Sequence, residues 1–163
     1  MTAPYGLVGQ AGGVSELEQR LQADLTAAMK ARDALRTGTL RMAIAALKEA
    51  KVAGSEARDL DDDDVETVLR AQVKRRDEAA EAFRGGGRDE QADKELAERE
   101  ILASYLPKGL DGDELAALVD ETLSAGGFDD MSQMGPAMKS VMAAVAGRAD
   151  GKVVSAMVRE RLS

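Results

Sequence analysis

The 163-residue chain contains no cysteine and no histidine. Without cysteine the chain has neither a thiol nucleophile nor a disulfide framework, and without histidine it lacks the commonest general base and metal ligand. No apolar run approaches the roughly 18 to 20 residues that a membrane span needs, and residues 1–14 lack the basic and apolar regions of a secretory signal. We therefore expect a cytoplasmic protein that has no membrane partner and uses no metal or organic cofactor.

Aromatic residues are also scarce, at 2% of the chain, whereas alanine, leucine and charged residues are abundant. Aromatic and β-branched residues favour strands, while alanine, leucine, glutamate, arginine and lysine favour helices. The apolar content of 44% is ordinary for a globular protein. The composition therefore predicts an all-α fold.

The formal net charge of −8 opposes indiscriminate binding to DNA or to an anionic membrane, because long-range repulsion hinders the approach. The charges are nevertheless unevenly distributed. Residues 30–58 carry seven basic and three acidic side chains, and residues 131–163 carry five basic and two acidic ones. Residues 107–130, in contrast, carry one basic and seven acidic side chains. A polyanionic partner must therefore bind to a local basic patch.

Two helices are predicted before residue 55. The sequence SELE at residues 15–18 matches a capping box, in which the Ser15 hydroxyl accepts from a backbone N–H and Glu18 reaches back to the cap. A helical stripe of leucine and alanine follows as far as Met29. Asp33 is expected to cap the second helix, which ends near Gly54 and has a basic face opposite its apolar face.

The third and longest helix is predicted to begin in the sequence LDDDDV at residues 60–65. Four consecutive aspartates suggest a magnesium site, but consecutive residues on a helix point in different directions and cannot converge on one ion. Capping, together with anionic residues in the first turn, explains the aspartates better.

The sequence RGGGR at residues 84–88 is predicted to end this helix, and Asp89 to cap a fourth one that runs to Pro107. The two helices would then form a long antiparallel hairpin. A solvated turn is the simpler interpretation of the glycines, although Arg84 and Arg88 would also allow the turn to approach a phosphate backbone.

Proline, glycine and acidic residues cluster at residues 107–112, which is typical of a linker. Three shorter helices are predicted after it. The expected organisation is a flexible extension at 1–14, an N-terminal four-helix domain at 15–106, the linker, and a smaller three-helix domain at 113–163. A domain of this last size buries a small core, so we expect it to be only modestly stable.

The sequence GRADGK at residues 147–152 resembles a phosphate-binding loop. A Walker A loop needs one more residue between its glycines and a serine or threonine after its lysine, and both requirements fail. Gly147 is instead expected to end one helix and Asp150 to cap the next. The basic side chains of Arg148 and Lys152 beside a helix N-terminus leave two interpretations open, namely surface charge and a contact with one phosphate group.

Three stretches of the sequence together resemble the GatB/YqeY family. They are LQADLTAAMKARD with LRMAIAALKEAK, VKRRDEAAEAFRGGGRDEQADKELAEREILASYLP, and MGPAMKSVMAAVAGRADGKVVSAMVRERL. The last stretch is similar to the C-terminal tail domain of GatB, a subunit of the tRNA-dependent amidotransferase. The resemblance implies a four-helix part followed by a three-helix tail, an association with tRNA and translation, and a family label of carbon-nitrogen ligase with glutamine as amido-N-donor.

The residues do not support catalysis by this chain alone. A glutaminase needs a nucleophile with a base, and the chain has no cysteine and no S-x-x-K spacing. Activation of an acyl acceptor by ATP would need a phosphate loop and a magnesium site, and the sequence contains neither motif.

The leading hypothesis is an accessory protein that binds tRNA or another structured RNA through phosphates. Because almost no aromatic rings are present to stack unpaired bases, we expect the partner to be a folded RNA. The candidate phosphate-binding residues are Lys139, Arg148, Lys152, Arg159, Arg36, Arg41 and Lys48.

Two alternatives involve protein partners. Methionines 131, 134, 138 and 142 would line a groove for a partner helix if they were exposed, although methionines at helical spacing are more often part of a core. The protein would otherwise join an amidotransferase as an auxiliary or regulatory subunit.

Overall fold

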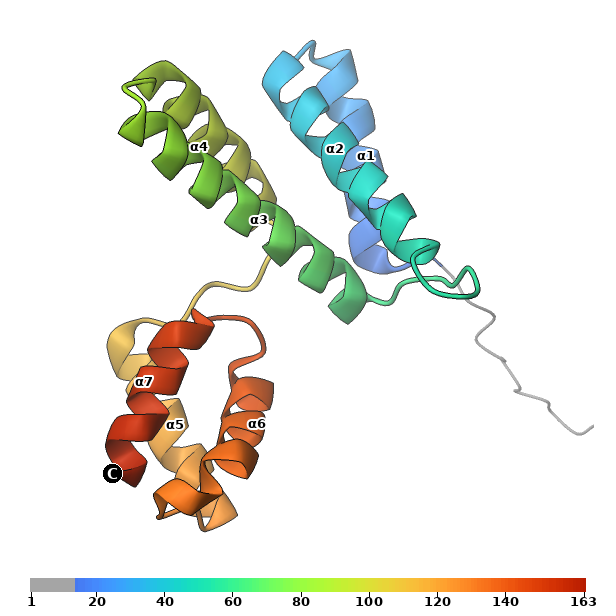
Figure 1. Ribbon diagram of the computed structural model, residues 1–163. Coiled ribbons are helices and arrows are strands. Elements are labelled where there is room, and N and C mark those ends of the chain that lie inside the picture. The colour runs from blue at the N-terminus through green and yellow to red at the C-terminus, as the bar shows by residue number, and fades with distance from the viewer. Residues whose placement is uncertain (1–13) are drawn as a thin grey trace, which may run out of the picture. The chain divides into compact units, whose positions relative to one another are not determined.

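Residues 14–163 are described by the computed structural model, in which they form seven α-helices and one short 3₁₀-helix (Figure 1). This part of the chain contains no strand, and the all-α prediction is therefore confirmed. The extension predicted at residues 1–14 lies outside the described residues, apart from Val14. No helix within residues 14–163 is long and apolar enough to cross a membrane.

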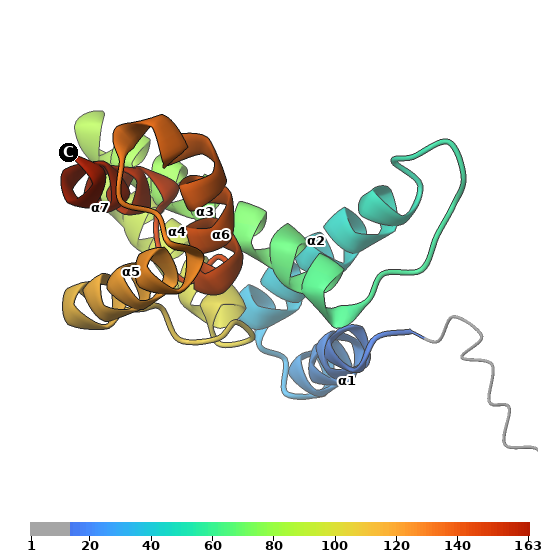
Figure 2. The ribbon, with the colours of Figure 1, turned by 90° about the horizontal axis from the view of Figure 1, so that it is seen from below.

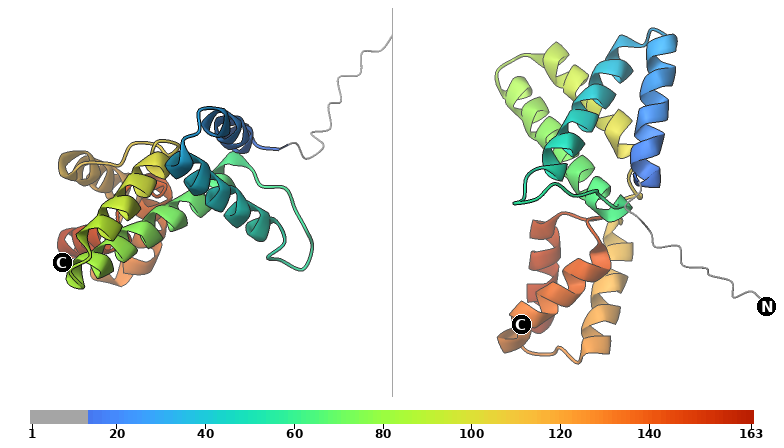
Figure 3. Two further views of the ribbon diagram at one scale, coloured as in Figure 1. Left: turned by 90° about the horizontal axis from the view of Figure 1, so that it is seen from above. Right: turned by 90° about the vertical axis from the view of Figure 1, so that its right-hand side faces the viewer.

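The chain divides into two compact units between Leu106 and Pro107. The first unit contains the helices α1 (Glu16–Lys30), α2 (Ala34–Lys51), α3 (Asp62–Gly85) and α4 (Asp89–Ala103). Helices α1 and α2 form one antiparallel hairpin, and α3 and α4 form the other, as Figure 3 shows from two sides. The long hairpin predicted around the glycine-rich turn is therefore present. A wide loop joins the two hairpins (Figure 2).

The two hairpins share one apolar core. Leucine, alanine and valine recur at helical spacing on α1, α2 and the first half of α3, so each helix has an apolar face that it buries against the others. Tyr105, just beyond α4, closes one end of this core and is 5% exposed. The buried core residues are Leu21, Ala28, Leu40, Ala43, Ile44, Leu47, Leu60, Val65, Leu69, Leu102 and Tyr105.

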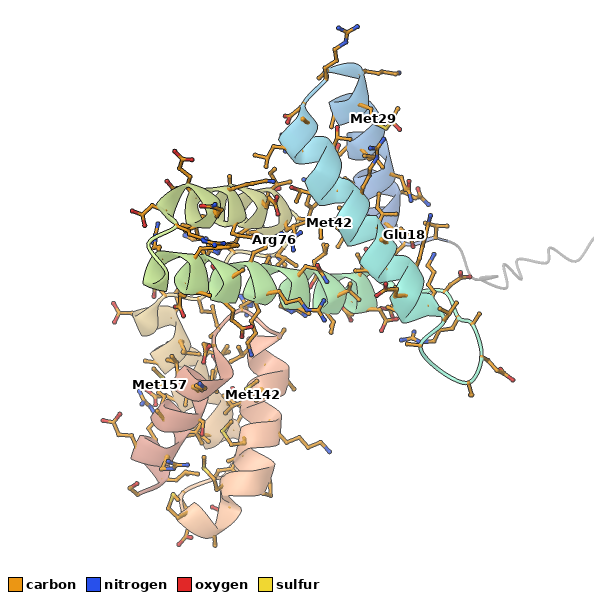
Figure 4. The ribbon with its side chains drawn as sticks, turned by 45° about the horizontal axis from the view of Figure 1, so that its top comes forward. Glu18, Met29, Met42, Arg76, Met142 and Met157 are labelled. Atoms are coloured by element: carbon orange, nitrogen blue, oxygen red, sulfur yellow. The ribbon has the colours of Figure 1, made fainter. Side chains whose placement is uncertain are left out.

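The start of α1 differs from the predicted capping box. The Ser15 hydroxyl accepts from the backbone N–H of Glu18 at 2.9 Å, as expected. The Glu18 carboxylate does not complete the box, because it is buried and pairs with the Lys51 ammonium at the end of α2, at 2.8 Å. This buried ion pair fixes the first turn of α1 to the last turn of α2 (Figure 4).

Three of the four consecutive aspartates accept hydrogen bonds from different groups, and the first of them caps α3 as predicted. Asp61 caps α3 and forms a capping box with Asp64. Asp64 also accepts from both Nη atoms of Arg58, at 2.7 and 3.1 Å. Asp62 accepts from the backbone N–H of Leu17 at 3.1 Å, so it caps α1 across 45 residues of sequence. The aspartates therefore anchor α3 to the loop before it and to α1.

A buried arginine joins α3 to α4. Arg76 is 4% exposed, and its Nε atom lies 3.3 Å from a carboxylate oxygen of Glu98 on α4. Its Nη1 atom donates to the side-chain oxygen of Gln72 at 3.2 Å, and its Nη2 atom lies 3.9 Å from the sulfur of Met42 on α2 (Figure 4). Because Arg76 contacts two other helices, it also fixes the position of the α3–α4 hairpin against α2.

The start of α4 differs from the prediction. Asp89 is the first residue of the helix, and Arg88 occupies the N-cap position without a side-chain hydrogen bond to the backbone. Gly87 precedes it with φ 73°, a conformation that glycine adopts without steric cost. The acidic side chains of Asp89 and Glu90 in the first turn therefore stabilise the helix through its dipole rather than as a cap.

The second unit contains α5 (Gly112–Gly126), the 3₁₀-helix η1 (Met131–Gln133), α6 (Met134–Val145) and α7 (Gly151–Leu162). Asp111 and Glu114 form the predicted capping box at the start of α5. The second unit has its own apolar core, with buried residues Leu115, Val119, Leu123, Ala137, Val141, Val145, Val154, Val158 and Leu162.

The four methionines proposed to line a groove do not share one exposed surface. Met134 and Met138 are half-buried and pack against the core of the second unit. Met131 and Met142 are exposed. The arrangement therefore matches the alternative interpretation, in which part of the series fills the core.

Candidate nucleic-acid interface

The basic side chains of the chain fall into a paired and an unpaired group. Eight of the 22 lysine and arginine side chains have a carboxylate oxygen within 4.0 Å, and all 22 lie within the described residues. Five of the eight belong to α3, to α4 or to the loop before α3, namely Arg58, Arg70, Arg76, Arg84 and Arg99. None of the seven predicted phosphate-binding residues has such a partner within residues 14–163.

The three predicted residues of α2 do not lie on one face. Arg41 and Lys48 are seven residues apart and lie on the same side, since residues on a helix are separated by about 100° each. Arg36 is five residues before Arg41 and is rotated from it by about 140°. All three side chains are exposed. The structure therefore groups Arg41 with Lys48 and separates Arg36 from them.

Arg36 lines a different hollow, which lies between the end of α1 and the start of α2. This hollow has a volume of about 330 Å³ and is also lined by Asp24 and Asp33. The neighbouring hydroxyl of Tyr105 donates to Asp24 at 2.5 Å, and the guanidinium of Arg20 lies 4.6 Å from the Tyr105 ring centre. Because carboxylates surround it, Arg36 is less available to an anion than Arg41 is.

A basic hollow that the sequence did not predict lies on the other side of α2. It has a volume of about 440 Å³, and Arg32 and Arg41 line it together with Met29 and Thr37. No carboxylate lines this hollow. Arg32 was missed because it lies in the turn between two helices, where no helical face could be assigned to it.

The loop between α6 and α7 has the predicted capping geometry. The Asp150 carboxylate accepts from the backbone N–H of Lys152 at 2.7 Å, and α7 begins at Gly151. The C-cap of α6 is Ala146, with φ 50°, and Gly147 follows with φ 74°. A backbone hydrogen bond also fixes this loop to the segment before α5, because the N–H of Leu110 donates to the Arg148 carbonyl at 2.8 Å.

Arg148 has a structural role in addition to its charge. Its Nε atom donates at 3.3 Å to the Val145 carbonyl near the end of α6, which also accepts from the Arg148 backbone N–H at 3.1 Å. A cation at this position is also stabilised by the helix dipole. Only part of the Arg148 guanidinium therefore remains available to a ligand.

The remaining basic residues of the second unit lie on α6 and α7. Lys152 and Arg159 are seven residues apart and share one side of α7, and Lys139 is exposed on α6. The acidic residues of this unit belong mostly to α5 and to the segment that follows it. Asp130 in that segment caps η1. Its carboxylate accepts a hydrogen bond from the backbone N–H of Ser132, and this bond holds the pKa of the Asp130 carboxyl below its usual range. The unit thus has an acidic part and a basic part.

The unpaired cations have a chemistry that suits phosphate groups. Unpaired guanidinium and ammonium groups bind phosphate oxygens through charge-assisted hydrogen bonds. Within residues 14–163, no three acidic side chains come close enough together to hold a metal ion. Tyr105, the one tyrosine within residues 14–163, is not a candidate base, because burial and its bond to Asp24 raise its pKa to about 12.

Comparison with protein families identifies a match to this chain. A family model described as Yqey-like protein matches residues 18–162, which include both units. A search of curated proteins gave no significant match.

Proposed function

Because this chain belongs to the Yqey-like family, we propose that it is an accessory protein that binds tRNA or another structured RNA and has no catalytic activity of its own. One observation carries the proposal. The cations of α2, α6 and α7 lack carboxylate partners within the described residues, except for Lys51 and Arg161, whereas most ion pairs involve α3 and α4. Free cations on an acidic protein supply a local site for a polyanion.

The aromatic side chains support a folded rather than a single-stranded RNA. Tyr105 is buried, and Phe83 and Phe128 are half-buried, so none of the aromatic rings within residues 14–163 is fully exposed. Proteins that bind single strands stack bases on exposed rings, whereas helical RNA is recognised through its shape and backbone. The unpaired cations therefore suit contacts with the phosphates of a structured RNA.

The experiment is a comparison of two charge-reversal variants. In the first variant Lys139, Arg148 and Lys152 are changed to glutamate. In the control Lys74, Arg75 and Lys94 are changed to glutamate. These residues are exposed cations of α3 and α4 that have no carboxylate partner among the described residues, and their reversal gives the same change in net charge. We expect the first variant to bind a folded tRNA transcript at least about tenfold more weakly, and the control to lose less than about threefold. Equal losses would contradict the proposal, because the effect would then follow net charge alone.

A second candidate function is that of an auxiliary amidotransferase subunit, which an apolar stripe on α2 favours. Leu35, Met42 and Val52 are all at least 36% exposed and lie within about 100° of each other around the helix axis. Such a stripe is suited to a protein partner. We expect the protein to co-elute with the purified subunits of an amidotransferase. Met42→Glu should abolish this co-elution, and the control Val153→Glu should not. Elution as a separate species would exclude this candidate.

A further inference from the structure

The turn between α1 and α2 places an arginine where the backbone favours glycine. After the last residue of α1, the N–H of Arg32 donates to the Met29 carbonyl at 3.2 Å and the N–H of Asp33 donates to the Ala28 carbonyl at 3.0 Å. These two bonds form a Schellman motif, whose central residue has a left-handed conformation and is usually glycine. Arg32 occupies this position with φ 57°. A side chain that is kept at a steric cost indicates a role beyond the turn.

Arg32 and Arg41 line the same hollow. It has a volume of about 440 Å³, and Met29, Ala34, Thr37 and Gly38 complete it. The Nη2 atom of Arg41 lies 3.8 Å from the Met29 sulfur, which directs this side chain towards α1. A Cβ atom added to Gly38 would meet nothing within 4 Å, so this part of the hollow is open to a ligand.

The charges around the hollow favour an anion. Neither Arg32 nor Arg41 has a carboxylate within 4.0 Å among the described residues. The nearest acidic residue in sequence, Asp33, accepts from the backbone N–H of Arg36 at 2.9 Å and lines the opposite hollow instead. Two guanidinium groups that face one space offer paired N–H donors, and this geometry matches the oxygens of a phosphate group.

We propose that the hollow lined by Met29, Arg32, Thr37 and Arg41 is a phosphate-binding subsite, with Arg32 and Arg41 as its two ligands. That the phosphate belongs to an RNA backbone rests on the function proposed above. The subsite itself requires only a phosphate group that can enter the hollow.

The first arm of the test is an NMR titration with inorganic phosphate, which replaces chloride at constant ionic strength. We expect saturable shifts of the Nε–H signals of Arg32 and Arg41 and of the backbone amides of Thr37 and Gly38. Arg32→Gly and Arg41→Gln should both abolish saturation, and the control Arg75→Gln, at an exposed cation of α3, should retain it. Arg32→Gly should unfold at the same denaturant concentration as the wild type or at a higher one, since glycine adopts φ 57° freely. Its loss of binding then cannot reflect a loss of folding.

The second arm uses a folded tRNA transcript. In each arginine variant the slope of log affinity against log salt concentration should decrease in magnitude by about 1, which is the loss of one phosphate contact, and Arg75→Gln should keep the wild-type slope. Phosphate shifts that do not saturate, or that persist in both variants, would overturn the subsite. If RNA also bound all variants equally, the subsite would fail while the RNA-binding function remained. Saturable phosphate binding without any RNA binding would overturn the RNA as the source of the phosphate.

Discussion

The Tyr105 hydroxyl is a strongly perturbed titrating group in the core of the first unit. It donates to Asp24 at 2.5 Å, and burial together with this bond raises the pKa of Tyr105 to about 12. Since the pKa of an unfolded tyrosine is about 10, folding favours the protonated form. The stabilisation is therefore complete below about pH 10 and is lost as the pH rises from about 10 to about 12.

We predict that Tyr105→Phe removes this pH dependence. At neutral pH the variant should lose about 1 kcal/mol of unfolding free energy, because one hydrogen bond is missing and the partly exposed Asp24 regains water. Above pH 10 the difference between the variant and the wild type should become smaller. Urea unfolding at a series of pH values, followed by circular dichroism, measures both effects. A difference that stays constant from pH 7 to 12 would show that Tyr105 titrates as an unperturbed tyrosine.

Glycine at position 126 is required by the ring of Phe128. A Cβ atom at Gly126, the last residue of α5, would overlap the Phe128 ring, which packs against the core of the second unit. Gly85 is the last residue of α3 and meets nothing within 4 Å of an added Cβ atom. We therefore predict that Gly126→Ala destabilises the second unit by about 1–3 kcal/mol, because the ring must move.

Gly85→Ala is the matched control, and its unfolding free energy should be unchanged or higher by up to about 1 kcal/mol. Thermal or urea unfolding of the two variants decides the question. Equal effects of the two substitutions would mean that the Phe128 ring moves without lowering the unfolding free energy.

At the scale of the helix, the sequence predicts local interactions well and long-range ones poorly. The bonds made by Ser15, Asp33 and Asp150 at their own helix starts were predictable, because a cap acts within three residues of the chain. The bond from Leu17 to Asp62 spans 45 residues and depends on how α1 and α3 meet. Glu18 does not form its predicted capping box for the same reason, since Lys51 becomes its neighbour only in the folded unit.

The bond between Leu17 and Asp62 gives a prediction for α1. Asp62→Ala should lower the stability of the first unit by about 1 kcal/mol, the usual cost of removing a helix cap. Asp63→Ala should change it by less than about 0.5 kcal/mol, since only the backbone carbonyl of Asp63 forms a hydrogen bond among the described residues. Urea unfolding compares the two. A larger loss for Asp63 would show that the run of aspartates acts through charge rather than through this cap.

The candidate interface was predictable to a similar extent. An excess of cations in residues 30–58 and 131–163 is a property of the sequence, and the structure leaves those on α2, α6 and α7 without carboxylate partners among the described residues, except for Lys51 and Arg161. The sequence could not tell that Arg36 faces Asp24 across a hollow, or that Arg32 joins Arg41 in another. Both facts depend on where the turn after α1 directs its side chains.

At the scale of the whole molecule, each of the two units has a separate core. The second unit contains only the residues from Pro107 to Ser163, and a core built by so short a segment contributes little stability. We propose that residues 107–112 act as a linker and that the second unit opens more readily than the first.

Hydrogen exchange of the full chain, followed by mass spectrometry, measures this difference. Peptides from α5, α6 and α7 should exchange on the order of tenfold faster than peptides from the buried faces of α1 to α4. Equal protection in both units would indicate that the whole chain opens cooperatively, and the linker proposal would then be wrong.

The central claim is that an acidic protein binds a folded RNA through confined groups of unpaired cations. The most direct test is the affinity of the wild-type protein for a folded tRNA transcript between about 50 and 200 mM salt. We predict that log affinity falls linearly with log salt concentration, with a slope of about −0.9 for each phosphate contacted, so that four contacts give about −3.6. An affinity that is flat over this range, or no binding at the lowest salt concentration, would contradict the account.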